Sequence, residues 1–256
     1  MKRILLTATA AALMTATAQA HELKTHDHSC NVDLQYAISL DNRQVTLTDD
    51  GSEFALANGE LRHNGKAIAL SSADQQQLRR YEDGLRQLVP QVNAVTREAL
   101  AIAGEATEFA FATLLGPDHE SVKEMRGKFA NLTSEIGKRM DDRHLPSRAM
   151  SMQDEDWNIA GGGASLGWSV LSASTAIVGK AMHAAFDEEY AKQWQAQLDQ
   201  MEHDLDQKVE ARAELLEAKA ESLCANMTEL EKIETTLAAS NPALKRFDVV
   251  RLRAEH

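Results

Sequence analysis

The sequence predicts an α+β protein, with a small N-terminal antiparallel β-meander packed on an elongated bundle of long, heptad-patterned α-helices. Two observations lead to this class. Apolar residues recur with a period of two over residues 34–70, and with alternating spacings of three and four over much of residues 71–239. The composition agrees, since only 5% of the residues are aromatic and Ala, Leu, Glu and Gln are abundant.

The segment 34–70 reads as four or five short strands joined by tight turns. Leu34, Tyr36, Ile38 and Leu40 alternate with polar residues, and shorter alternating runs follow. Dipeptides that suit hairpin turns separate these runs, because Asn-Gly and Asp-Gly adopt positive φ at low cost. These dipeptides are Asp50-Gly51, Asn58-Gly59 and Asn64-Gly65.

The helical region 71–143 predicts two helices. Ser71 or Ser72 caps the first, with Asp74 and Gln75 placed for a capping box. Its apolar seam runs from Leu78 to Thr113. Pro90 predicts a kink or a short break, and Gly116-Pro117 the end of the helix. A second helix is expected over residues 118–143.

The longest predicted helix covers residues 183–239. Its apolar positions follow the spacing of a helix packed on a partner helix. They are Val209, Ala213, Leu216, Ala220, Leu223, Met227, Leu230 and Leu237. Such seams suit either a bundle within a monomer or a homodimer, and the sequence leaves both open. In the tail 240–256, the stretch 247–252 would add a strand to the meander or fray.

Residues 1–20 have the features of a cleaved signal peptide. Lys2 and Arg3 precede an apolar run over residues 4–14, and Ala18-Gln19-Ala20 forms a small-x-small cleavage site. The run is too short to span a bilayer. We therefore expect cleavage after Ala20 and export, with the bacterial periplasm as the destination.

Export bears on the two cysteines, Cys30 and Cys224. An oxidising compartment favours a disulfide between an even pair, and we expect this bridge to tie the two ends of the mature chain together. A loop of this length could stabilise the fold by roughly 3–5 kcal/mol. Two buried free thiols are the alternative.

His21, His26 and His28 lie in the leader 21–33, which is expected to be flexible. Closely spaced imidazoles beside a free amine could hold copper, zinc or nickel weakly. The alternative, which we favour, is a polar tail without a metal, because no second cluster completes a site. No cofactor is predicted.

A polar linker at 144–158 leads to the segment 159–182, which is rich in Gly, Ser and Ala. Residues 159–179 contain no charge. This stretch predicts a buried helix or hairpin, or else an amphiphilic surface that touches a membrane or a partner. Its Gly161-Gly162-Gly163 run lacks the Lys and Ser/Thr of a phosphate-binding loop.

The net charge of the chain and the absence of catalytic motifs argue against several classes of function. The net charge of −12 becomes −14 once the signal peptide is removed, which opposes binding to nucleic acid. The sequence contains no Gly-x-Ser-x-Gly or His-Glu-x-x-His motif. Glu105 and Glu108 read as ordinary solvated helix positions, as do Asp187 and Glu188. No catalytic residue is predicted.

One block of about 27 residues resembles the YggN-like family of bacterial periplasmic proteins. It is NGKAIALSSADQQQLRRYEDGLRQLVP at 64–90, where a turn and a strand lead into a Gln-rich helix start with Tyr81, Leu85, Arg86 and Pro90. The signal peptide and the long C-terminal helix extend the similar layout. The resemblance implies a periplasmic address and this architecture, with no assigned activity, substrate or cofactor.

Three functions remain open, and the sequence does not exclude an enzyme. The first is an exported, non-enzymatic envelope protein that binds a protein or cell-wall partner through helical surfaces. The second is an amphiphile carrier or membrane-contacting protein that uses residues 159–179. The third is weak metal buffering by the N-terminal histidines.

Overall fold

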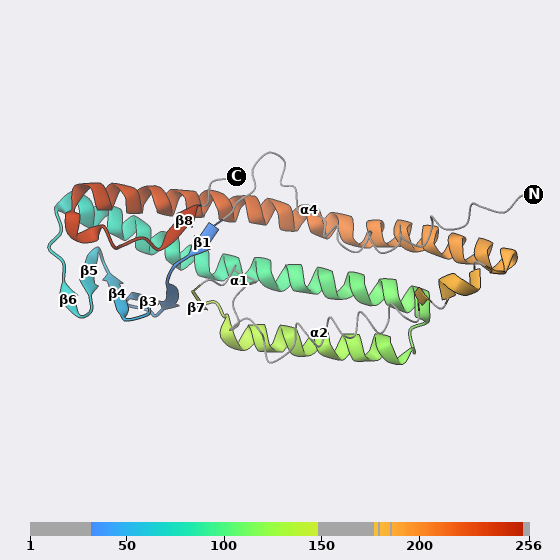
Figure 1. Ribbon diagram of the computed structural model, residues 1–256. Coiled ribbons are helices and arrows are strands. Elements are labelled where there is room, and N and C mark those ends of the chain that lie inside the picture. Colours follow the sequence, from blue (N-terminus) through green and yellow to red (C-terminus); the bar gives the residue numbers. More distant parts are fainter. Residues whose placement is uncertain (1–31, 148–176, 179, 185, 253–256) are drawn as a thin grey trace, which may run out of the picture.

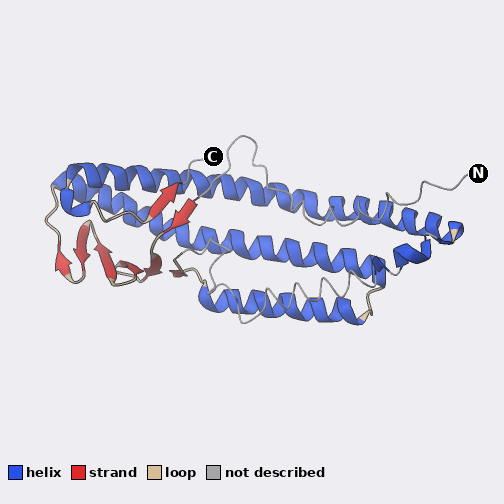
Figure 2. Cartoon of the chain, in the orientation of Figure 1, coloured by secondary structure: helices blue, strands red, loops and turns tan. Residues whose placement is uncertain are grey.

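The computed structural model describes residues 32–147, 177, 178, 180–184 and 186–252 (Figure 1). It confirms the α+β class. The strands gather at one end, and the long helices run away from them side by side (Figure 2). The helix α1 lies between α4 and α2 and contacts both of them.

The larger sheet has six antiparallel strands in the order β6-β5-β4-β3-β2-β7. Five of them form the expected meander within residues 37–67. The sixth follows α2 in the chain and pairs with β2 at the edge of the sheet. The strands are β2 Ala37–Leu40, β3 Val45–Asp49, β4 Ser52–Ala57, β5 Glu60–His63, β6 Lys66–Ala67 and β7 His144–Leu145.

The C-terminal apolar stretch forms a strand but does not join the meander. β8, Val250–Leu252, pairs antiparallel with β1, Val32–Leu34, in a separate two-stranded sheet. β8 also contacts α4. The two termini of the described chain therefore meet beside the longest helix.

Two of the hairpins have the tight turns that their Asn-Gly sequences predict. Asn58 and Gly59 have φ values of 54° and 84°, and Asn64 and Gly65 have 47° and 76°. Positive φ at both central residues is the requirement of a two-residue type I′ turn. The first of these turns also lies against α1, because Asn58 N donates to Glu82 Oε2 at 2.9 Å.

Replacing Gly59 with Ala is expected to lower the free energy of unfolding by about 2–4 kcal/mol. A Cβ atom here would lie 2.6 Å from the carbonyl oxygen of Gln75, so the hairpin would have to move away from α1. Gly65→Ala is the matched control, since Gly65 also has positive φ but open space around it, and should cost only about 1 kcal/mol. Urea unfolding of both variants measures the difference. Equal losses would show that hairpin and helix are not in tight contact.

α1, Ser72–Leu115, begins with the expected capping box. Ser71 Oγ accepts from Asp74 N at 3.1 Å, and Ser71 N donates to the Asp74 carboxylate. The helix continues through Pro90 without a break and ends at Gly116. α2, Glu120–Arg139, is shorter than predicted, because the backbone becomes extended at Met140 and leads into β7.

α4, Glu188–Ser240, begins five residues later than the sequence pattern suggests. Asp187 interrupts the helix, and its side chain accepts from the backbone N–H groups of Glu189 and Tyr190 at 3.1 and 3.0 Å. This is an N-cap, so a second, shorter helical stretch ends just before it. A short 3₁₀ turn, η3 Pro242–Leu244, follows α4.

The core lies where the sheet meets the beginning of α1 and the end of α4. Phe247 is fully buried there, and its ring packs edge-on against Phe54 and Tyr81 with centroid distances of 5.2 and 5.1 Å. Leucines of the α1 seam and the second half of the α4 seam surround it. The buried seam residues include Leu78, Leu85, Leu88, Leu223, Met227, Leu230 and Leu237.

Candidate partner-binding surface

The helices are less tightly packed far from the sheet. We call residues 94–113 of α1 and residues 188–215 of α4 the distal half. Between Asn93 and Leu114, α1 has no buried residue, and α4 has none before Leu216. The apolar seams are therefore half-exposed in the distal half, whereas they are closed next to the sheet.

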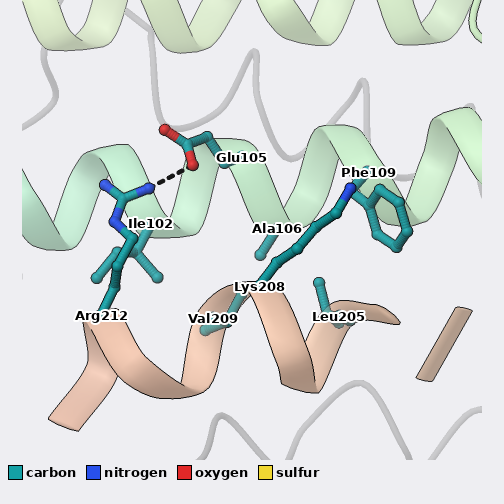
Figure 3. Close-up of a pocket in the computed structure, with 8 residues that line it drawn as sticks. All are labelled: Ile102, Glu105, Ala106, Phe109, Leu205, Lys208, Val209 and Arg212. Carbon is teal, nitrogen blue, oxygen red and sulfur yellow. Dashed lines mark hydrogen bonds and ion pairs between the residues drawn. The ribbon is translucent and has the colours of Figure 1, made fainter. Parts of the chain in front are cut away.

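Charged side chains hold α1 and α4 together in this region (Figure 3). Arg212 reaches across from α4, contacting Glu98 at 3.0 Å and also Glu105. Lys208 places its ammonium 4.1 Å from the centroid of the Phe109 ring. Between these contacts is a small cavity of about 40 Å³. Its lining residues are Ile102, Glu105, Ala106, Phe109, Leu205, Lys208, Val209 and Arg212.

Glu105 and Glu108, read from the sequence as ordinary solvated helix positions, keep solvent exposure, and each also forms an ion pair with a neighbouring helix. Glu105 pairs with Arg212 of α4, and Glu108 pairs with Arg126 of α2 at 2.6 Å. The hydrogen bond from Arg126 lowers the pKa of Glu108. Exposed pairs of this kind contribute little stability, about 0–1 kcal/mol each, so they set the register of the helices more than they stabilise them.

A more open groove of about 190 Å³ lies between α1 and α2. Its apolar walls include Leu100, Met125 and Phe129, and Gly104 leaves the space that a larger residue would fill. Ligand pockets usually measure about 300–1,000 Å³. The groove is therefore of a size to accept a side chain of a partner rather than to enclose a substrate.

Three of the four exposed large hydrophobic side chains among the described residues lie at the tip, at the end of the helices away from the sheet. Residues 177, 178, 180–184 and 186 are helical there. Val178, Met182 and Phe186 are 52%, 59% and 89% exposed. Their spacing of four residues puts them on one face of the helix, and we call these three residues the tip stripe.

Other residues anchor this short helix to the bundle. Lys180 Nζ donates to the carbonyl oxygen of Leu114 at the end of α1 and lies 5.9 Å from the Trp194 ring. The His183 ring packs edge-on against Tyr190 at 4.5 Å. The tip helix therefore has one attached side, and the tip stripe is left facing solvent.

The surroundings of the tip stripe are acidic. α4 contains thirteen Asp and Glu residues and five Lys and Arg residues. Within residues 187–206, seven are acidic and only Lys192 is basic. Lys192 pairs with Glu188 at 3.0 Å. The exposed start of α4 is thus a region of strong negative potential.

The structure also places a carboxyl group in the core, which the sequence patterns did not reveal. Glu234 is 4% exposed, and it accepts from Tyr81 Oη at 2.5 Å and from the backbone N–H groups of Val249 and Val250 at 2.8 and 3.1 Å. Burial raises the pKa of Glu234 to about 8, and burial likewise raises that of Tyr81. The spacing in the sequence did indicate that this residue is buried, since position 234 fits the α4 seam between Leu230 and Leu237. Enclosed in this way, Glu234 links α1, α4 and the C-terminal segment and is no candidate for chemistry on a substrate.

One hydroxyl–imidazole pair is found on the surface of the sheet. Ser52 Oγ lies 3.2 Å from His63 Nε2 across the β4–β5 hairpin. The His63 ring stacks on Phe54 at 4.5 Å, and neither residue lines the two cavities described above. We interpret this pair as a cross-strand contact of the hairpin.

The residues singled out from the sequence are only partly within the described chain. His21, His26, His28 and Cys30 lie outside it, as does most of the uncharged stretch 159–179, so their roles stay predictions. Cys224 is half-buried on α4, next to the buried Leu223. Among the described residues, no group of three His, Cys, Asp or Glu side chains is arranged to hold a metal ion.

Comparison with known proteins gives one match. A family model described as "Protein of unknown function (DUF2884)" matches residues 30–250, which agrees with the resemblance to YggN-like proteins. No curated protein and no solved structure matches the chain. Within the part of the chain that the structure describes, no helix has the length and apolar character needed to cross a bilayer.

Proposed function

Because the chain belongs to the DUF2884 family of proteins of unknown function, we propose a function from its own surfaces. The protein is an exported, non-enzymatic envelope protein that binds a protein or cell-envelope partner through its helical surfaces. The tip stripe is the contact point, and the sheet end is the structural base.

The tip stripe is the observation that carries this proposal. Among the described residues, four large hydrophobic side chains are exposed, and three of them are Val178, Met182 and Phe186. Burying such a side chain stabilises a complex by about 1.5–3 kcal/mol. A cluster of this kind on a soluble surface marks an interaction site more often than chance exposure.

The periplasmic address is part of the proposal. It is supported by the signal-like residues 1–20 and by the path of the chain around the cysteines. β1 begins at Val32, two residues after Cys30, and pairs with β8, which contacts the helix that carries Cys224. A Cys30–Cys224 disulfide is consistent with this path and would fix the N-terminus of the mature protein beside α4.

Membrane contact is the second candidate, because Val178 belongs to the uncharged stretch 159–179 and is exposed. The acidic residues at the start of α4 count against it, since like charges repel an anionic lipid surface. We therefore favour a protein or cell-wall partner, and the experiment below separates the two.

Site-specific photo-crosslinking in intact cells tests the proposal. With a photoreactive amino acid in place of Phe186, illumination is expected to give a defined crosslinked species in the envelope fraction. The same label at Glu229, an exposed position of α4 near the sheet, is the control and should give none. Met182→Ser should remove the species formed at position 186, because it breaks the same apolar face. Crosslinking to lipid alone would favour the membrane alternative, and equal products from both positions would contradict the assignment of the tip.

A further inference from the structure

We infer that the tip stripe receives a short cationic amphipathic helix of another envelope protein. This inference rests on the proposed function and names the chemistry of the partner. It combines two properties of one end of the molecule, the shape of its apolar face and the sign of the charge beside it.

The shape of the tip stripe suits a helix. Val178, Met182 and Phe186 recur every four residues, and each lies in a described helical stretch. This spacing matches that of a partner helix, which presents apolar side chains at spacings of three and four. Lys180 and His183 already attach this helix to the bundle, which favours binding by limiting the ordering that the tip would need.

The charge beside the tip stripe selects a cationic partner. Asp187, Glu188 and Glu189 follow Phe186 directly in the chain. Of the two lysines nearby, Lys192 pairs with Glu188, and Lys180 donates to the Leu114 carbonyl on the attached side of the tip helix, so the carboxylates outnumber the cations here. An apolar face edged by carboxylates is complementary to a helix with Lys or Arg next to its apolar side.

The same charge disfavours the other occupants of this surface. A second copy of the chain would bring two acidic α4 helices together, and each chain without residues 1–20 has a formal net charge of −14. An anionic membrane would be repelled for the same reason. Acidic residues near an interface also increase the association rate of a cationic partner at low salt.

Peptide binding to the full-length protein tests the partner class. The probe is a fluorescent 18-residue amphipathic helix of Leu and Lys, and its matched control has Glu in place of every Lys. Fluorescence anisotropy should show binding of the Lys peptide, weaker binding at higher salt, and no binding of the Glu peptide.

Variants locate the binding site. The double substitution Met182→Ser with Phe186→Ser should weaken binding of the Lys peptide by about tenfold or more, whereas Leu215→Ser should leave it unchanged. Leu215 is 64% exposed on α4 and is therefore a matched control. The double substitution Glu188→Gln with Glu189→Gln should reduce both the affinity and its salt dependence. Circular dichroism checks that all variants remain folded.

The inference is overturned if both peptides bind equally, or if Leu215→Ser weakens binding as much as the tip variants do. Binding to anionic phospholipid vesicles in place of the Lys peptide would also overturn it. If crosslinking at Phe186 succeeds in cells while the Lys peptide fails to bind, the proposed function stands and the cationic partner class is wrong.

Discussion

At pH 8 and above, the Glu234→Gln variant is expected to be more stable than the wild-type protein. Glu234 is enclosed by Tyr81 and by the backbone of Val249 and Val250, and burial raises its pKa from 4.5 to about 8. Glutamine is a neutral side chain of the same shape. It can occupy the site without the cost of removing a charge from water.

The direction of this pH dependence follows from proton binding to Glu234. The folded protein holds the Glu234 proton up to about pH 8, whereas the unfolded chain releases it near pH 4.5. Between these values the folded state binds more protons, so the stability of the wild type falls by about 1.4 kcal/mol for each pH unit. The contribution is complete below the unfolded pKa and is lost as the pH rises through the folded one.

Urea unfolding of wild type and variant at several pH values between 4 and 9 measures this difference. The two should have similar stability near pH 4.5 and diverge by about 3–5 kcal/mol at pH 8. Glu229→Gln, at an exposed position of the same helix, is the control and should follow the wild type. Parallel curves for wild type and Glu234→Gln would mean that the folded protein holds an ionised carboxylate at this site.

Other carboxyl groups do not obscure the effect of Glu234 on the pH dependence of stability, because they titrate at lower pH. Hydrogen bonds and nearby cations lower their pKa values, so the stability they contribute is lost only as the pH falls below the normal carboxyl range. These residues are Asp41, Asp74, Glu108, Glu135 and Asp141.

Removing the proposed Cys30–Cys224 disulfide is expected to lower the free energy of unfolding by about 3–5 kcal/mol. The bridge would close nearly the whole mature chain into one loop, which restricts the unfolded ensemble strongly. Its loss would also release the N-terminal segment that leads into β1, so the small β1–β8 sheet should become less ordered.

The measurement starts with mature protein purified from the periplasm, whose mass and thiol titration report cleavage after Ala20 and the oxidation state. Urea unfolding then compares the oxidised protein, the reduced protein and Cys30→Ser. A reductant should destabilise the wild type and leave Cys30→Ser unchanged. Two titratable thiols in the untreated protein would contradict the disulfide.

Local sequence patterns predicted most of the fold because local contacts determine those elements. The Asn58-Gly59 and Asn64-Gly65 turns require positive φ, and the Ser71 capping box satisfies the first backbone N–H groups of α1. The three-four spacing of α1 identifies the face that is buried next to the sheet. These features depend on residues close together in the chain.

The remaining features depend on residues far apart. β7 pairs with β2 across about a hundred residues, and β1 pairs with β8 across the whole described chain. The pattern of apolar residues did not locate the break at Asp187, because the seam that it identified begins only at Val209. The sequence patterns did not identify Glu234 as buried. The free-energy cost of burying its carboxyl group is offset by hydrogen bonds from Tyr81 and the C-terminal backbone, which no local pattern brings together.

The tip stripe also depends on tertiary contacts that the sequence patterns do not reveal. The sequence marked the uncharged stretch 159–179 as unusual and offered burial or an exposed surface as alternatives. For Val178, at its end, the outcome depends on how the tip helix is attached, which Lys180 and Leu114 determine. Exposure is a property of the tertiary arrangement, so the tip stripe could not be identified from spacing alone.

The length of α4 has a consequence for how the protein would work in the envelope. Its 53 residues form one helix about 80 Å long, with the core at one end and the tip at the other. If the tip stripe is the contact point as proposed, a body of this form would act as a spacer, which holds that patch far from its own centre of mass. It could reach past neighbouring molecules and meet a partner at a fixed distance without any moving part.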